Sequence, residues 1–253
     1  MSRFLNLSAY RFVTLNDLAD LRESVRSHAQ QAGLKGTVLL AEEGINFCLA
    51  GPPAGLDAFM AWLDADSRFA GLTAKRSWSD QPPFGRLLVK VKREIIRMNR
   101  PAIRPEAQRA PSVDPLTLAR WLDRGHDDDG VPVVMLDTRN AFEVDHGGFE
   151  GAIDWRLAKF SDFPAALEQH HTALQGKTVV SYCTGGIRCE KAALLMQEQG
   201  IERGLQLEGG ILAYFEATGG RHYRGGCFVF DERVALDPSL SPAESAALLP
   251  TPS

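Results

Sequence analysis

The sequence predicts a two-domain α/β protein, in which an α/β sandwich is followed by a domain built on a parallel sheet. Three observations support this fold class. The chain has 253 residues, 44% of them hydrophobic and 24% charged, which is a globular composition at a length of about two domains. Strand-like and helix-like apolar patterns alternate in both halves of the chain. Four prolines separate the halves, at Pro101, Pro105, Pro111 and Pro115.

The first hundred residues carry strand and helix patterns in the order β-α-β-β-α-β. Apolar runs predict strands at residues 4–13 (with a break near Ala9), 36–41, 45–49, 72–78 and 87–96. Helical spacing predicts helices at residues 15–32 and 53–63, and Gly33 ends the first of them. This order indicates a ferredoxin-like α/β sandwich over residues 1–100, a layout that hosts many unrelated functions.

The proline-rich stretch 101–125 is predicted to be a linker followed by a helix at 115–122, which Asp114 caps and Pro115 begins. Residues 126–225 form the predicted second domain. A continuous apolar run predicts a buried parallel strand at 131–136, and further strands are predicted at 178–182 and 204–207. Helical patterns predict its crossover helices around 141–144, at 188–199 and at 211–216.

A C-terminal extension is predicted for residues 226–253. We expect it to be mobile from about residue 237, because the last seventeen residues contain four prolines, four serines and no aromatic residue. No apolar run approaches the roughly 18 residues that cross a bilayer. The first residues do not resemble a secretion signal, so we expect a cytoplasmic protein without a membrane partner.

The cysteine content excludes some classes of site. Four cysteines are too few for a disulfide scaffold, and Cys48, Cys183, Cys189 and Cys227 include no C-x-x-C pair. We therefore expect reduced thiols and no structural zinc site.

Basic residues concentrate in one segment of an acidic protein. From Lys75 to Arg109 there are ten basic and three acidic residues, so the segment carries +7 while the chain as a whole carries −4. Such a block suits an anionic partner such as nucleic acid; the alternative is a set of strand and linker residues that face water. Within the predicted strand at 87–96, Lys92 and Arg93 would face opposite sides. The candidate contacts to RNA are Lys90, Lys92, Arg93, Arg97 and Arg100.

One segment carries cysteine chemistry. Cys183 follows the predicted strand at 178–182, Gly185 and Gly186 allow the backbone to curl, and a helix follows. Backbone N–H groups in such a turn form a cradle for an anion, so the thiol should have a lowered pKa. The candidate loop consists of Cys183, Thr184, Gly185, Gly186, Ile187, Arg188 and Cys189. The alternative is a buried cysteine in a tight strand-to-helix turn.

A phosphatase function is disfavoured by the spacing in this loop. The loop of tyrosine phosphatases has five residues between cysteine and arginine, whereas only four separate Cys183 from Arg188. Tyr182 also stands where that loop usually has histidine.

Motifs in the second half of the chain resemble a rhodanese domain, in which the loop cysteine carries a persulfide. They are Asp137-Thr138-Arg139, Glu143, residues 147–152 (GGFEGA) and the Cys183 loop. Taken with further motifs, the chain resembles the oxygen-dependent tRNA uridine(34) hydroxylase family from about Lys35 to Leu236. These further motifs are residues 35–46 (KGTVLLAEEGIN), 183–192 (CTGGIRCEKA), 206–212 (QLEGGIL) and 226–234 (GCFVFDERV).

The resemblance implies an enzyme that hydroxylates C5 of the wobble uridine of tRNA to 5-hydroxyuridine. It implies molecular oxygen as co-substrate, the anticodon arm of tRNA as partner, and Cys183 as the active residue. We expect no bound cofactor, no metal and no obligate protein partner, and the reductant is unknown. Two departures stand out: Phe47-Cys48 occupies a position where smaller residues are usual, and the tail has no cysteine.

Two other functions stay open. One is a sulfurtransferase that passes sulfur from a Cys183 persulfide to an acceptor. The other is a non-catalytic RNA-binding module whose loop merely holds an anion.

Roles are also predicted for residues around the loop. Arg188 is expected to stabilise the thiolate or to contact an anionic substrate group, with a structural salt bridge as the alternative. Cys189 is expected to turn its side chain away from the cradle, with a resolving thiol as the alternative. Asp137 and Arg139 are expected to brace the domain by capping and ion pairing. Three further residues are expected to be packed: Tyr182, Cys48 and Cys227.

Overall fold

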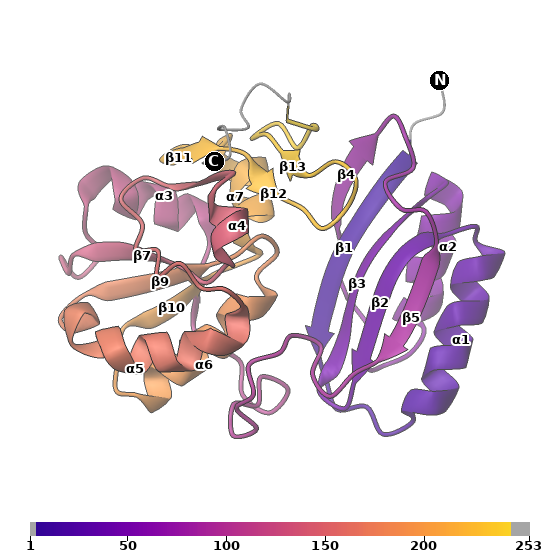
Figure 1. Cartoon of the computed structure of the whole chain (residues 1–253), viewed down its shortest axis with the longest axis horizontal. Helices are drawn as coiled ribbons and strands as arrows, with labels where there is room; N and C mark the ends of the chain where they lie inside the picture. Colours follow the sequence, from indigo (N-terminus) through magenta and orange to yellow (C-terminus); the bar gives the residue numbers. More distant parts are fainter. Residues whose placement is uncertain (1–3, 244–253) are drawn as a thin grey trace. The chain divides into compact units, whose positions relative to one another are not determined.

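The computed structural model describes residues 4–243 and divides into two compact units (Figure 1). Unit 1 runs to Arg97 and includes two further segments, Pro105–Ala107 and Asp231–Arg233. Unit 2 comprises Met98–Arg104, Gln108–Phe230 and the described chain from Val234. Among the described residues, no helix has both the length and the hydropathy that a membrane span needs.

Unit 1 is a five-stranded sheet with two helices on one face (Figure 1). The strand order is β4-β1-β3-β2-β5, and every pairing is antiparallel except that of β2 with β5. The predicted ferredoxin-like sandwich is confirmed, with β5 added at one edge. Its elements are β1 (Phe4–Phe12), α1 (Leu18–Gln31), β2 (Lys35–Ala41), β3 (Gly44–Gly51), α2 (Pro53–Asp64), β4 (Lys75–Ser79) and β5 (Leu87–Val91).

Several strands of unit 1 differ from the predicted ranges; β4, for example, begins at Lys75 instead of residue 72. β1 is continuous through Ala9, which is buried and pairs with Phe47, so the predicted break is wrong. β5 ends at Val91 instead of residue 96, because its partner β2 ends at Ala41. Beyond that point the Ile95 N–H donates to a side chain, the Glu43 carboxylate, at 2.7 Å.

Unit 2 contains a parallel sheet with strand order β6-β10-β9-β7, as predicted for a domain with crossover helices. Helices α5 and α6 lie on one side of this sheet, and α3 and α7 lie on the other (Figure 1). Its strands are β6 (Ser112–Val113), β7 (Val133–Asp137), β9 (Thr178–Tyr182) and β10 (Gly204–Leu207). Its helices are α3 (Pro115–Arg124), α4 (Ala141–Val144), α5 (Phe163–Leu174), α6 (Ile187–Glu198) and α7 (Gly210–Thr218).

Short ribbons complete unit 2. β8 (Gly147–Phe149) pairs with β11 (Tyr223–Gly225), and β12 (Cys227–Phe228) pairs with β13 (Ala235–Leu236); a 3-10 turn spans Phe160–Asp162. The predicted cap of α3 is confirmed, since the Asp114 carboxylate accepts from the N–H groups of Leu116 and Thr117 at 3.0 Å each.

The stretch predicted to be mobile begins in a hydrogen-bonded turn. The Asp237 carboxylate accepts from the N–H groups of Ser239 at 2.9 Å and Ser241 at 3.1 Å. The Ala243 N–H donates to the Ala235 carbonyl at 2.9 Å. Residues 244–253, to which the same prediction applies, lie outside the described residues.

Candidate active site

The Cys183 loop sits at the carboxyl end of β9, between the sheet and helix α6. Gly186 adopts a left-handed conformation with φ of 100°, and α6 begins at the next residue. This turn brings the Gly186 N–H within 3.1 Å of the Cys183 Sγ, to which it donates. The Cys183 residue is only 1% exposed, so its thiol is buried in the strand-to-helix turn, as the alternative interpretation of this loop predicts.

The N-terminus of α7 donates hydrogen bonds to the backbone of the Cys183 loop. The Ile211 N–H donates to the Cys183 carbonyl at 2.9 Å, and the Leu212 N–H donates to the Thr184 carbonyl at 3.1 Å. Gly210 has φ of 67°, and a Cβ there would lie 2.5 Å from the Cys183 carbonyl oxygen. Gly210 therefore supports the loop, a role that the sequence analysis missed. The signal for it was the glycine pair at the end of β10.

The environment favours the thiolate of Cys183. Burial by itself raises the pKa of this thiol, but the Cys189 thiol, the Arg188 charge and the N–H groups of Arg188 and Gly186 outweigh burial and lower the pKa to about 5. The sequence-based expectation of a cradle that lowers the pKa agrees with this direction.

Arg188 forms a buried salt bridge. Its guanidinium donates to both carboxylate oxygens of Glu143 in α4, at 2.6 and 2.7 Å, and both side chains are buried. For Arg188 the expected role is a direct one at the thiolate, with a salt bridge as the alternative. The structure shows the salt bridge, because a buried guanidinium requires a paired acceptor. The charge of Arg188 nevertheless helps to lower the pKa of Cys183.

Glu143 thus belongs to the site, and the sequence analysis gave it no role beyond its place in a motif. One of its oxygens also accepts from the Asn140 N–H at 3.0 Å, which closes a capping box at the start of α4. A short helix and the Cys183 loop are thereby linked through one carboxylate.

The prediction that the Cys189 side chain turns away from the cradle is wrong. Its thiol neighbours the Cys183 thiol, whose pKa it helps to lower, and lies 3.7 Å from the Thr138 hydroxyl. Burial, followed by the neighbouring Cys183, raises the pKa of Cys189 well above its ordinary value. Cys189 is therefore the protonated partner of the pair, next to the Cys183 thiolate. A resolving role for this thiol stays open.

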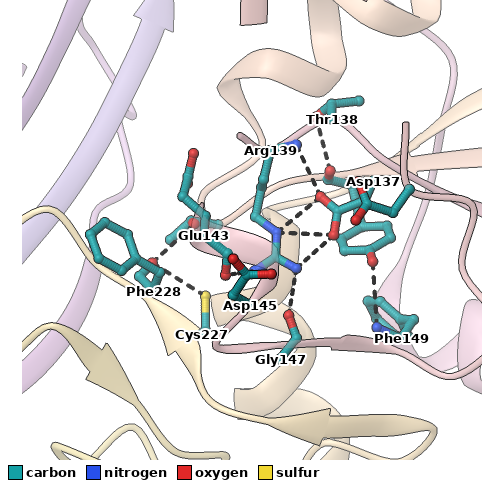
Figure 2. Close-up of polar contacts among 12 residues, drawn as sticks. Asp137, Thr138, Arg139, Glu143, Asp145, Gly147, Phe149, Cys227 and Phe228 are labelled. Carbon is teal, nitrogen blue, oxygen red and sulfur yellow. Dashed lines mark hydrogen bonds and ion pairs between the residues drawn. The ribbon is translucent and has the colours of Figure 1, made fainter. Parts of the chain in front are cut away.

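Asp137 and Arg139 brace the domain as predicted (Figure 2). The fully buried Arg139 guanidinium donates to the Asp137 carboxylate, with the shortest contact at 2.6 Å, and to the Gly147 carbonyl at 2.7 Å. Tyr182 is also buried, and its ring packs edge-to-face against Phe149. These contacts join β7, β8 and β9 directly behind the loop.

The two other cysteines differ from Cys183 in their environment. Cys227 is fully buried, and burial raises its pKa to about 12. Cys48 lies in β3 of unit 1, and burial raises the pKa of its thiol too. Cys227 is packed, as predicted, whereas Cys48, predicted to be a buried strand residue, is only partly buried. Within residues 4–243 no cluster of three or more His, Cys, Asp or Glu side chains could hold a metal ion, and the absence of a metal stays a prediction.

The candidate RNA contacts are all exposed, but they do not lie on one unit. Lys90, Lys92, Arg93 and Arg97 belong to unit 1, and Arg100 belongs to unit 2. β5 ends at Val91, so Lys92 and Arg93 follow the strand and the expected alternation of faces does not apply to them.

Alkylation of Cys183 should reach its plateau rate at low pH. A thiol reacts as its thiolate, so we expect a rate that rises with pH to a midpoint of about 5. At neutral pH Cys183 should react faster than Cys48 and Cys227, whose pKa values are raised. Burial slows all the rates but leaves the midpoint in place. Iodoacetamide labelling with peptide mass spectrometry across pH measures it; a midpoint at or above about 8.5 would exclude the cradle.

Two family models match the chain. A model described as "UPF0176 acylphosphatase like domain" matches residues 4–95, and one described as "Rhodanese-like domain" matches residues 118–217. The first match coincides with the sandwich of unit 1, and the second includes the whole Cys183 loop.

Curated relatives match over nearly the full length. The chain is 62% identical over 251 residues to a "tRNA uridine(34) hydroxylase" of Bordetella petrii, covering 99% of this chain and 100% of that protein. It is 63% identical over 241 residues to a protein of the same name from Cupriavidus taiwanensis, covering 95% of this chain and 86% of the relative. A relative with that name from Variovorax paradoxus is 62% identical over 241 residues, covering 95% and 92%.

Proposed function

The chain belongs to the tRNA uridine(34) hydroxylase family, and from this premise we propose that it hydroxylates C5 of the wobble uridine of tRNA with Cys183 as the active residue. The single observation that carries the proposal is the full-length match at 62% identity. The environment of Cys183 supports its role, because a thiolate is stabilised at the carboxyl edge of the sheet, where ligands of open α/β sheets bind.

The thiolate provides a route to an electron-rich C5. Addition of the Cys183 sulfur to C6 of uracil moves the electron pair of the C5–C6 double bond to C5. Molecular oxygen then reacts at C5; one oxygen atom stays as the hydroxyl group and the other leaves as water. This balance takes two electrons and two protons from a co-reductant. Loss of the C5 hydrogen and departure of the thiolate restore the double bond. The enzyme is therefore an oxygen-dependent oxidoreductase of the cytoplasm, where its tRNA substrate resides.

A covalent adduct is the signature of this route. In tRNA with 5-fluorouridine at position 34, fluorine replaces the C5 hydrogen whose loss accompanies departure of the thiolate, so a thioether between Cys183 and C6 should persist. A denaturing gel shift and mass spectrometry of the cross-linked peptide detect it. An active enzyme that forms no such adduct would contradict the addition step.

Nucleoside analysis tests the function itself. We expect 5-hydroxyuridine in tRNA from cells that carry the gene and its loss from cells that lack it. The oxygen atom should derive from ¹⁸O₂ and not from H₂¹⁸O. Equal amounts of the nucleoside in both strains would overturn the proposal.

Sulfur transfer is the second candidate, and the rhodanese-like match over residues 118–217 favours it. It requires a persulfide on Cys183 and an acceptor such as cyanide. A thiosulfate:cyanide assay separates the candidates, because the hydroxylase reaction needs no thiosulfate. A third candidate is a non-catalytic RNA-binding module. In that case replacing Cys183 should change neither RNA binding nor the amount of any reaction product.

The basic segment should contribute to the salt dependence of tRNA binding. Each phosphate contact contributes about 0.7 to the logarithmic salt slope for single strands and about 0.9 for duplex. Both Lys92 and Arg93 are exposed beyond β5, so replacing both with Ala should weaken binding and flatten the slope by between about one and two units. Titration of tRNA with the protein at a series of salt concentrations measures both the affinity and the slope.

A matched control removes the same charge elsewhere. Arg120 and Arg124 lie on α3 and pair with Asp128, so their double replacement by Ala should leave the slope unchanged. If the Lys92/Arg93 variant and the wild type give superimposable lines, the segment is a solvated surface and no part of the binding site.

A further inference from the structure

Three phenylalanine rings of unit 2 form an aromatic cluster at the surface. Phe142 comes from α4, Phe228 from β12 and Phe230 from the chain that follows. Each pair of rings meets edge to face, at centroid distances of 5.2 Å (Phe142–Phe228), 5.2 Å (Phe228–Phe230) and 6.4 Å (Phe142–Phe230). Phe142 is 46% exposed and Phe230 is 58% exposed, which is unusual for rings that already pack against each other.

The cluster is built onto the Cys183 loop by two contacts. The Thr184 hydroxyl, one residue after Cys183, donates to the Phe228 carbonyl at 3.1 Å. Phe142 directly precedes Glu143, whose carboxylate holds Arg188 of the loop. The segments that carry two of the rings are therefore bonded to the loop that carries the thiol.

A base that reacts at a thiol must leave its stack. Enzymes that act on a nucleobase take it out of the stack, which separates it from its neighbours. Unstacked bases in single-stranded loops are held on aromatic side chains, because every base has a π face. An exposed aromatic cluster whose backbone is bonded to the Cys183 loop supplies such a surface.

We propose that Phe142, Phe228 and Phe230 form a stacking platform for unpaired bases next to the target uridine in the anticodon loop. The inference rests on the proposed function, since it takes the substrate to be tRNA. The platform holds the neighbouring bases while the uracil reaches Cys183. It selects for an unpaired loop and not for a particular base, because stacking tolerates every base.

Replacement of the two exposed rings tests the platform. Loss of one stacked base should weaken binding of an anticodon stem-loop about 5- to 150-fold for Phe230→Ala or Phe142→Ala. Phe230→Tyr keeps an aromatic face and should bind like the wild type, whereas Phe230→Leu keeps only apolarity and should bind like the Ala variant. Leu116→Ala is the matched control, because Leu116 is an apolar residue of the same unit with 63% exposure.

A fluorescent base gives a direct signature. With 2-aminopurine at position 33 or 35 of the stem-loop, binding to the wild type should quench its fluorescence by stacking, and the Phe230→Ala and Phe142→Ala variants should lose part of this quenching. An alkylation midpoint of Cys183 equal to that of the wild type verifies that the loop is intact in each variant.

These measurements separate the inference from the proposed function. The Cys183→Ala variant should still bind and quench, because the rings act before any chemistry. Loss of quenching in the Phe variants supports the platform even if no 5-hydroxyuridine forms. Unchanged affinity and quenching in both Ala variants, or wild-type behaviour of Phe230→Leu, overturns the platform and leaves the cluster as an apolar surface for a protein partner.

Discussion

Cys183→Ala should reduce the formation of 5-hydroxyuridine by about 10³-fold or more, the effect of removing a nucleophile that acts with its supporting groups. Without the sulfur no covalent bond to C6 can form, and C5 is not activated. Liquid chromatography and mass spectrometry of nucleosides after incubation with unmodified tRNA measures the loss. Cys48→Ala is the control, because it removes a thiol of raised pKa in unit 1; its rate should match the wild type.

The same variant should fold. Because Cys183 is 1% exposed, removing its sulfur leaves a small cavity, and we expect a cost on the order of 1 kcal/mol. Loss of the hydrogen bond from the Gly186 N–H contributes a free energy of similar size, about 1 kcal/mol. Turnover within tenfold of the wild type in a folded variant would contradict Cys183 as the active residue.

Cys189→Ala distinguishes one thiol from two in the mechanism. If Cys189 only donates a hydrogen bond to the Cys183 sulfur, its loss raises the pKa of Cys183 and leaves partial activity at neutral pH. Cys189→Ser keeps a donor and should restore the alkylation midpoint. Complete loss of activity in both folded variants would instead favour Cys189 as a resolving thiol.

The elements that the sequence predicted best are bounded by local signals. The strands at Thr178–Tyr182 and Gly204–Leu207 have the predicted limits, because each is a short, mostly apolar segment followed by a cysteine or glycine turn. The end of β5 was predicted five residues too late, because it depends on where the paired strand β2 stops. The length of an edge strand depends on its partner strand as well, whereas a hydrophobic pattern describes only one of the two segments.

In the site, too, features set by local sequence were predicted, and contacts between distant segments were not. The cradle followed from two adjacent glycines, which impose a turn wherever the chain goes next. The partner of Arg188 is Glu143, 45 positions away, and spacing within the loop carries no information about it. The position of the Cys189 side chain was mispredicted for a related reason: the first turn of α6 rotates back toward β9, where Thr138 of another segment meets it. The aromatic cluster joins α4 to β12 and is likewise invisible in either segment alone.

Asp137→Asn should cost about 3–5 kcal/mol in the free energy of unfolding of unit 2, the largest stability effect that we expect. Both partners of the Asp137–Arg139 pair are fully buried, and the carboxylate accepts from Arg139 at 2.6 and 2.9 Å. An amide keeps the shape but leaves the guanidinium charge buried without a counter-charge, since the Gly147 carbonyl that also accepts from it is neutral. The loss is a large share of the roughly 5–15 kcal/mol that stabilises a typical domain.

Urea denaturation, with hydrogen exchange of β7 and β9 to assign the transition to unit 2, measures the cost. Asp145→Asn is the matched control, because Asp145 pairs with Arg156 at 2.7 Å on the surface, where both side chains are more than half exposed. Such a pair contributes about 0–1 kcal/mol, so this variant should unfold close to the wild type. Replacing both members of the buried pair, as Asp137→Leu with Arg139→Met, removes the uncompensated charge and should destabilise less than Asp137→Asn alone. If Asp137→Asn and Asp145→Asn shift the midpoint equally, the buried pair does not brace the domain.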